Sequence, residues 1–282
     1  MRDLTIDLAQ TSPALGDLRR NLDQHLDAIS AARKQRAKLV VFPELSLTGY
    51  FLNDLTEEVA VPLDHAVIKR LVAASRETAV GFGFVERARD HRVYNAYAYA
   101  EGGRIAHVHR KVYLPTYGIF DDGRYLAAGS RFDAFDASFG RVGILVCEDA
   151  WHLASSYLLF LQNVDLILCP SASPGRGVTA KGEVSSVRAW EAVLEAQAAL
   201  FQVFVAYCNR VGVEDGITFF GGSRVLDPFG AVISRVDGLE EGHATAKLEE
   251  GALRRARLFA PMRRDEKPEI VLRQLRRIVE ER

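Results

Sequence analysis

A run of apolar β-forming residues, Val142–Val146, ends abruptly on Cys147 and is followed by Glu148, Asp149, an alanine and a tryptophan. The run predicts a buried strand. Such a strand fixes the Cα of the cysteine, and the turn after it leaves the sulfur facing a cavity, with the next backbone N–H groups placed to bind an oxyanion. Cys147 is therefore a candidate nucleophile. The alternative is a structural cysteine, because an unpaired cysteine commonly acts as a small buried hydrophobe.

Strands and helices alternate along the rest of the chain. Apolar patterning predicts strands at 4–9, 38–42, 79–85, 93–100, 104–109, 165–169, 203–207, 222–226, 231–236 and 243–248, and helices at 18–37, 67–79, 153–162 and 183–200, with a short helix and a Pro268-led helix at the end. No linker, repeat or low-complexity segment divides the 282 residues. We therefore predict one α/β domain, residues 1–282, in which two sheets share a core and helices cover the outside.

Two further charged residues follow predicted strands. Glu44 comes after the apolar run 38–42, where an uncompensated buried charge would be costly, so it is either a turn carboxylate that accepts backbone hydrogen bonds or a general base with a raised pKa. Lys111 is the third residue of a long polar and aromatic loop, 109–125. It is either a solvated surface lysine or a cation that lowers a thiol pKa and stabilises an oxyanion.

Composition excludes several other classes of protein. The formal net charge is −1, from 36 basic and 37 acidic residues, so nothing favours nucleic acid or an anionic membrane as a partner. Three cysteines without paired spacing argue against a disulfide framework and structural zinc. His107 and His109 alternate without a third ligand, which favours strand-surface histidines over a metal site, and the glycine-rich stretch before Lys181 lacks the phosphate-loop pattern. No signal core or membrane span is seen, so we expect a soluble, cytoplasmic protein.

Taken together, Glu44, Lys111 and Cys147 resemble the Glu-Lys-Cys triad of the nitrilase superfamily of carbon–nitrogen hydrolases. The neighbouring words match as well: Phe-Pro-Glu at 42–44, His-Arg-Lys at 109–111, Cys-Glu-Asp at 147–149 and Asn-Arg-Val-Gly-Val-Glu at 209–214. The resemblance covers nearly the whole chain. It implies a four-layer αββα sandwich with two mixed sheets, a subunit that pairs into a homodimer or higher homo-oligomer, and chemistry that needs no metal or cofactor.

The resemblance also assigns roles. Glu44 would take the thiol proton, Cys147 would attack an amide or nitrile carbon, and Lys111 with the backbone N–H of Glu148 would hold the oxyanion. Asp122 stands where the family usually has a glutamate that orients the lysine or the substrate, one methylene shorter. This leaves three classes of function: a thiol amidohydrolase acting on a small linear amide, a nitrilase, and a catalytically silent assembly module.

Within the superfamily, the loop 114–125, the stretch 147–151 and the Ser-Ala-Ser-Pro at 171–174 look like the glutamine-hydrolysing domain of glutamine-dependent NAD synthetases. The sequence lacks the ATP-binding half of those proteins, so we expect an independent amidase or a glutaminase that feeds ammonia to a separate synthetase. The residues that this resemblance or their position places at the substrate are Tyr117, Asp122, Glu148, Trp151, Ser173 and Arg176.

Chemistry then favours a particular substrate head. The side chain of Glu148 would face a cationic group, and Arg176 or Lys181 would pair with a carboxylate, so a glutamine-like ω-amide is expected over simple aliphatic amides. The alternative is that Glu148 hydrogen-bonds the loop and leaves the pocket neutral.

Overall fold

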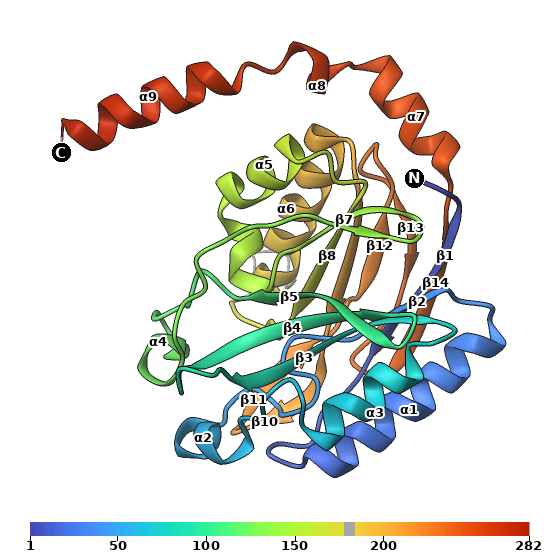
Figure 1. Ribbon diagram of the computed structural model, residues 1–282, viewed down its shortest axis with the longest axis vertical. Coiled ribbons are helices and arrows are strands. Elements are labelled where there is room, and N and C mark those ends of the chain that lie inside the picture. Colours follow the sequence, from blue (N-terminus) through green and yellow to red (C-terminus); the bar gives the residue numbers. More distant parts are fainter. Residues whose placement is uncertain (178–183, 282) are drawn as a thin grey trace.

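The computed structural model describes residues 1–177 and 184–281, and two six-stranded mixed sheets form its centre (Figure 1). The first sheet has the order β14 (Gly242–Leu248), β1 (Leu4–Gln10), β2 (Leu39–Val41), β3 (Ala79–Arg87), β4 (Val93–Glu101) and β5 (Arg104–Arg110). The second has the order β13 (Val232–Arg235), β12 (Arg224–Leu226), β9 (Phe204–Asn209), β8 (Leu166–Ser171), β7 (Gly140–Ile144) and β6 (Phe135–Ala137). A separate hairpin joins β10 (Val211–Glu214) to β11 (Ile217–Phe220).

Helices cover the outer faces of the two sheets, as Figure 1 shows. α1 (Leu18–Lys34) and α3 (Ala66–Ala74) pack on the first sheet, and α5 (Leu153–Leu161) and α6 (Ser185–Phe201) on the second. The predicted αββα sandwich with two mixed sheets is confirmed. Three helices, α7 (Glu250–Phe259), α8 (Met262–Asp265) and α9 (Pro268–Glu280), lead away from it, and short helical turns lie at η1 (Asn53–Leu55), α2 (Thr56–Val59), α4 (Asp122–Tyr125) and η2 (Cys147–Trp151).

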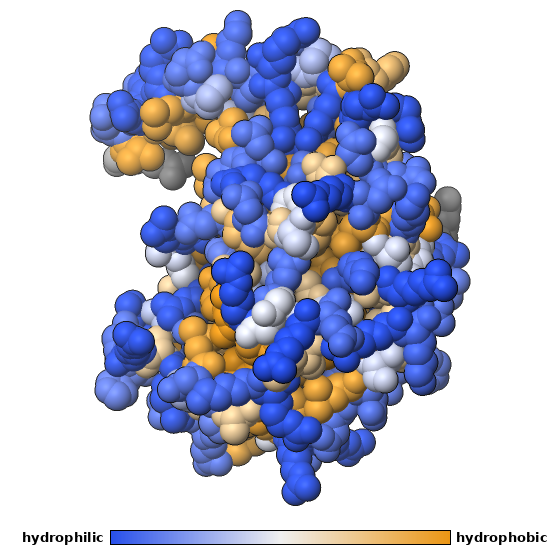
Figure 2. Space-filling model, turned by 45° about the vertical axis from the view of Figure 1, so that its right-hand side comes forward, coloured by the Kyte–Doolittle hydropathy of each residue, from blue (hydrophilic) through white to orange (hydrophobic). Residues whose placement is uncertain are grey.

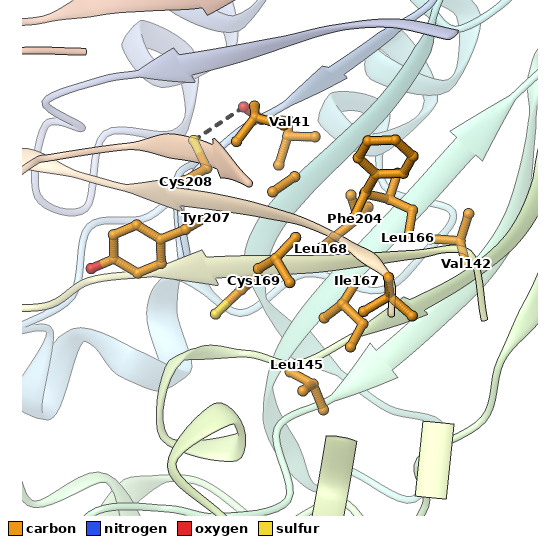
Figure 3. Packing of buried hydrophobic residues seen from close by; sticks show 14 of the residues in the cluster. Val41, Val142, Leu145, Leu166, Ile167, Leu168, Cys169, Phe204, Tyr207 and Cys208 are labelled. Atoms are coloured by element: carbon orange, nitrogen blue, oxygen red, sulfur yellow. Dashed lines mark hydrogen bonds between the residues drawn. The ribbon is translucent and has the colours of Figure 1, made fainter. Parts of the chain in front are cut away.

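Alternation along the strands of the first sheet separates its two faces. Tyr97 and Tyr99 of β4 belong to the large core between the sheets, whereas Ala96 and Ala98 belong to the cluster under α1 and α3. Between the sheets, the thiol of Cys208 on β9 approaches the carbonyl oxygen of Val41 on β2 at 3.2 Å (Figure 3). Cys208 is thus a core residue that joins the two layers.

Several predicted boundaries shift. The helix predicted to reach residue 37 ends at Lys34, and the one predicted to reach 79 ends at Ala74. Glu183, the predicted start of the fourth helix, lies outside the described residues. The hairpin of β10 and β11 was not predicted, although its Asp215-Gly216 turn, with φ values of 49° and 76°, is a strong hairpin signal.

A close approach of two backbones fixes the turn after β2. A Cβ at position 83 on β3 would lie 2.3 Å from the backbone nitrogen of Leu45 and 2.9 Å from the carbonyl oxygen of Pro43. Only glycine fits there. Gly83 therefore lets the chain around Glu44 lie directly against the neighbouring strand.

Candidate active site

The site lies where strand ends of the two sheets meet. Glu44 follows β2 and Lys111 follows β5 in the first sheet, while Cys147 follows β7 and Ser173 follows β8 in the second. The strand predicted to run up to Cys147 ends at Ile144, but the backbone N–H of Leu145 still donates to Leu168 on β8 at 2.9 Å. Cys147 then opens the turn η2 with a φ of 48°, in the left-handed region that costs a non-glycine residue about 1 kcal/mol or more.

Three charged side chains form a buried cluster. The Lys111 ammonium donates to Glu44 Oε1 at 2.8 Å and to Asp122 Oδ2 at 2.9 Å, and 1% of Lys111 is exposed. The shorter side chain of Asp122 therefore still reaches the lysine. Tyr50 donates to the other oxygen of Asp122 at 2.6 Å, and this bond holds the carboxylate in place. Lys111 is not a solvated surface residue.

Glu44 has a full set of hydrogen-bond partners besides Lys111. The side-chain amide of Asn95 on β4 donates to Oε1 at 2.8 Å, and the backbone N–H of Ala172 donates to Oε2 at 2.8 Å. Because Ala172 directly follows β8 of the second sheet, Glu44 bridges the two halves of the fold. Glu44 accepts a backbone hydrogen bond, as expected of a turn carboxylate. It also lies beside the candidate nucleophile, as a general base would.

Burial and an excess of carboxylates set the electrostatics. Burial raises the pKa of Glu44, and the neighbouring Asp122 raises it further against the opposing pull of Lys111. Burial opposes the charge on Lys111, but the carboxylates of Asp122 and Glu44 outweigh it and raise the pKa of the ammonium well above its ordinary value. The cluster therefore keeps a charged lysine beside a carboxylate with increased affinity for a proton.

The Cys147 thiol faces this cluster. Its sulfur lies 3.6 Å from Ser173 Oγ. Burial and Glu44 raise the pKa of the thiol well above its ordinary value, while Lys111, Ser173 and the backbone of Ala172 act in the opposite direction. The resting group is a thiol, so an attack by sulfur requires a base to take the proton as the bond forms.

Of the six predicted substrate residues, Asp122 and Ser173 are buried, whereas Tyr117, Glu148, Trp151 and Arg176 are at least partly exposed. Tyr117, half exposed, donates to Glu148 Oε2 at 2.9 Å, so Glu148 does hydrogen-bond a loop residue. The Arg176 guanidinium lies 5.9 Å from the centre of the Tyr117 ring. Trp151 is 41% exposed and packs edge-on against Trp190. Lys181, the other predicted partner of a substrate carboxylate, lies outside the described residues.

His109 corrects one expectation. It is buried, not a strand-surface histidine, and its Nε2 lies 2.8 Å from Asp149 Oδ2. His107 is half-buried and stacks on Phe135 at 4.6 Å. In the described part of the chain, no three His, Cys, Asp or Glu side chains lie so that they could hold a metal ion.

Sequence reasoning missed Asn95, Tyr50 and Asp149. Asn95 interrupts an alternating tyrosine–alanine strand, and a lone amide among apolar residues is a usable signal, since a buried amide needs a partner. Asp149 belongs to the Cys-Glu-Asp motif at 147–149, but the motif alone assigns it no role.

Comparison with known proteins identifies the family. A carbon-nitrogen hydrolase profile matches residues 5–258. The chain belongs to the carbon–nitrogen hydrolase family. It is thus a hydrolase of the nitrilase superfamily that acts on carbon–nitrogen bonds other than peptide bonds.

The relatives of this hydrolase include much longer proteins. It is 34% identical to a glutamine-dependent NAD(+) synthetase from Thermotoga maritima over 272 residues, which cover 94% of this chain and 45% of the relative. A solved glutamine-dependent NAD+ synthetase from Acinetobacter baumannii is 28% identical and superposes with a TM-score of 0.80 over 89% of this chain and 47% of its own. The chain thus spans less than half the length of these relatives.

Stand-alone structures share the fold. An amidase of the nitrilase superfamily from Nesterenkonia superposes with a TM-score of 0.81 at 22% identity, over 96% of this chain and 97% of the amidase.

In the described residues, each helix is too short or too polar to cross a membrane.

Proposed function

We propose that this carbon–nitrogen hydrolase is a thiol amidohydrolase that cleaves a small linear ω-amide through an acyl-enzyme on Cys147. The observation that carries the proposal is the buried cluster of Glu44, Lys111 and Asp122 beside the Cys147 thiol. In this cluster the Glu44 carboxylate would act as the base for the thiol, and the Lys111 ammonium beside it would act as the cation for a developing oxyanion.

The reaction then runs in two halves. Glu44 takes the thiol proton as the sulfur attacks the amide carbon, and Lys111 with the Glu148 backbone N–H stabilises the oxyanion. Protonated Glu44 gives its proton to the leaving nitrogen, ammonia or an amine departs, and a thioester remains. Water, deprotonated by Glu44, attacks the thioester, which releases the acid and restores the thiol.

The proposed substrate carries an amino-acid head. Glu148 accepts from Tyr117 through one oxygen, and its other oxygen lies 3.9 Å from His152. A substrate α-ammonium would join this acidic group, and the Arg176 guanidinium, 5.9 Å from the centre of the Tyr117 ring, would pair with the α-carboxylate. The 34% identity to a glutamine-dependent enzyme supports glutamine itself.

Steady-state ammonia release from glutamine, its deaminated 2-oxo analogue and butyramide tests this substrate. The proposal expects turnover of glutamine to be fastest and of butyramide slowest. Faster turnover of the 2-oxo analogue would remove the α-ammonium role from Glu148. Equal turnover of butyramide would contradict the amino-acid head and leave an amidase of another substrate. Preferential turnover of butyronitrile would favour the nitrilase alternative.

A second proposal concerns the fate of the ammonia. Two relatives that match more than nine-tenths of this chain are glutamine-dependent NAD(+) synthetases of about twice its length. This supports a glutaminase that supplies ammonia to an ATP-dependent synthetase partner. Stimulation of glutamine hydrolysis by added NAD synthetase and its substrates would support it, and an unchanged rate would favour an independent amidase.

We also propose a homodimer or larger homo-oligomer. Every residue of α9 is exposed, and its apolar residues Val271, Leu272 and Leu275 face a groove against Leu158 and Leu200 of α5 and α6. Figure 2 shows apolar side chains along the lower side of the arm that projects at the upper left. A second subunit would cover them. Light scattering at micromolar concentration tests this, and a stable monomer would contradict it.

A further inference from the structure

The Asp149 carboxylate is fully buried beside the candidate active site but takes no part in the proposed steps. Its Oδ1 accepts the backbone N–H groups of Val112 at 3.0 Å and Tyr113 at 2.9 Å. Its Oδ2 accepts the backbone N–H of Val146 at 3.1 Å and lies 2.8 Å from His109 Nε2, which donates to it. Four donors converge on one carboxylate, which compensates the cost of burying its charge.

The four donors come from the two segments that carry the reacting groups. His109, Val112 and Tyr113 bracket Lys111 at the end of β5 in the first sheet. Val146 precedes Cys147 after β7 in the second sheet. A single side chain thus ties the lysine segment to the nucleophile turn across the two sheets.

The same residue closes the strained turn. The backbone N–H of Asp149 donates to the Val146 carbonyl at 3.0 Å, while the Val146 N–H donates back to the Asp149 side chain. Cys147, with its left-handed φ of 48°, lies between them. A backbone held in this region needs surroundings that determine it, and reciprocal hydrogen bonds at both ends provide them.

We propose that Asp149 and His109 are positioning residues that set the Lys111 ammonium against the Cys147 thiol. His109 donates to one oxygen of Asp149, and its ring stacks on Phe132 at 5.8 Å, which holds this donor in place. Neither residue touches the reacting atoms. Their effect is on geometry, and a displacement of about 1 Å between reacting groups costs on the order of 100-fold in rate. The inference rests on the proposed function, because that function makes the lysine–sulfur arrangement matter.

Asp149→Asn is the first test, with Asp165→Asn as its matched control. Asp165 is another buried carboxylate, directly before β8, and it accepts hydrogen bonds from the backbone N–H of Arg141 at 3.1 Å and from the Arg257 side chain at 2.9 Å, away from the site. We expect Asp149→Asn to lower kcat by about 100-fold with KM for glutamine within about threefold. We expect Asp165→Asn to lower Tm at least as much and to keep kcat. A proportional loss of kcat in both variants would overturn the proposal.

Alkylation of Cys147 by iodoacetamide, mapped by peptide mass, gives a readout that needs no substrate. Removing the negative charge of Asp149 would by itself favour the thiolate and speed alkylation, whereas displacing Lys111 removes a group that lowers the thiol pKa and slows it. We expect alkylation in Asp149→Asn to slow roughly tenfold, the effect of about one pKa unit. Faster or unchanged alkylation would overturn the proposal, whichever amide the enzyme hydrolyses.

His109 provides a second route in case Asp149→Asn fails to fold. His109→Phe keeps a flat ring but loses the donor, and His109→Gln keeps a donor. We expect His109→Phe to lower kcat and slow Cys147 alkylation, and His109→Gln to restore most of both. Equal behaviour of the two variants would overturn the positioning role. If wild-type protein hydrolyses no amide but Cys147 alkylation still depends on His109 and Asp149, the proposed function fails and the positioning inference stands.

Discussion

Two buried ion clusters in this protein differ in their balance of charge. In the site, Glu44 and Asp122 share the single cation of Lys111. About the hairpin β10–β11, Arg210 pairs with Glu214 alone, and its guanidinium lies 4.2 Å from the centre of the Phe219 ring. Both cations are 1% exposed, so burial does not distinguish the two clusters.

The two clusters differ in whether a carboxylate remains able to accept a proton. Glu214 uses one oxygen for Arg210 and the other for the backbone N–H groups of Tyr50 and Phe51, both at 3.0 Å. That pair is neutral overall and holds a loop. The site carries one carboxylate in excess, and burial together with the neighbouring Asp122 raises the pKa of Glu44, which leaves it able to accept a proton. The balanced pair stabilises the backbone, whereas the unbalanced trio would, under the proposed function, provide the base.

The two clusters are also connected. Glu214 fixes the backbone of Tyr50, and the Tyr50 hydroxyl fixes Asp122. The balanced pair thus supports the unbalanced trio indirectly, through Tyr50. Substitutions in the pair should change mainly stability, whereas substitutions in the trio should change mainly catalysis.

The largest expected effect follows loss of the proposed nucleophile. Cys147→Ala should abolish turnover with the fold retained, because the Cys147 thiol lies within electrostatic reach of both Glu44 and Lys111 and is the group proposed to attack the amide. Cys169→Ala is the control, since Cys169 is fully buried in the core on β8. Ammonia release and far-UV circular dichroism measure both. Activity that survives in Cys147→Ala and is lost in Cys169→Ala would show that the nucleophile is assigned wrongly.

Substitution of each of the two cations should separate an effect on kcat from an effect on the stability of the fold. Lys111→Arg keeps the charge but changes the donor geometry in a fully buried slot, so kcat should fall by about 100-fold or more. Arg210→Met leaves Glu214 buried without its cation and should lower the free energy of unfolding by about 3–5 kcal/mol. Kinetics and urea unfolding measure the two. Near-normal kcat in Lys111→Arg would contradict the difference between the clusters.

The excess carboxylate should set the acid limb of activity. Glu44 must be unprotonated to take the thiol proton, so kcat/KM should rise with pH through a Glu44 pKa that burial and Asp122 place above the ordinary value for glutamate. Asp122→Asn removes one raising influence and lets Lys111 pair with Glu44 alone. The acid limb should therefore move to lower pH. A limb that moves to higher pH, or stays fixed, would show that another group controls it.

The smallest expected effect concerns the substrate head. Glu148→Gln removes the charge proposed to bind the α-ammonium but keeps an acceptor for Tyr117. KM for glutamine should rise about tenfold, which corresponds to ~1.4 kcal/mol, with KM for the 2-oxo analogue nearly unchanged. Equal effects on both substrates would place Glu148 in loop structure alone.

The sequence predicted most of the strands and helices that form the layers, but it did not predict the short strand β6 or the point where β7 ends in a turn. Apolar runs such as 38–42 and 203–207 locate strands because a strand covered on both faces must be apolar throughout. β6 escaped prediction because Phe135–Ala137 is three residues long and has no period to detect. The end of β7 escaped because Leu145 and Val146 are as apolar as the strand before them, and only the geometry of the turn separates them.

The candidate site was likewise predicted only in part. Glu44, Lys111 and Cys147 were predicted as site residues because each follows an apolar strand and the neighbouring motifs resemble those of a family. Asn95, Tyr50 and Asp149 were not assigned roles, since their importance depends on which residue lies opposite in space, more than 25 residues away in the chain. A pattern along one strand carries no information about such pairs.

Mass spectrometry of the acyl-enzyme tests the central claim most directly, namely that the unbalanced trio activates Cys147. Wild-type protein and Lys111→Arg are mixed with glutamine, quenched in acid within the first turnover, and digested for peptide mapping. We predict that wild-type protein carries one glutamyl group on the peptide containing Cys147, and that Lys111→Arg carries little or none at the same time. A glutamyl group on another cysteine, or rapid hydrolysis with no adduct detectable on Cys147 under any quench, would contradict the account.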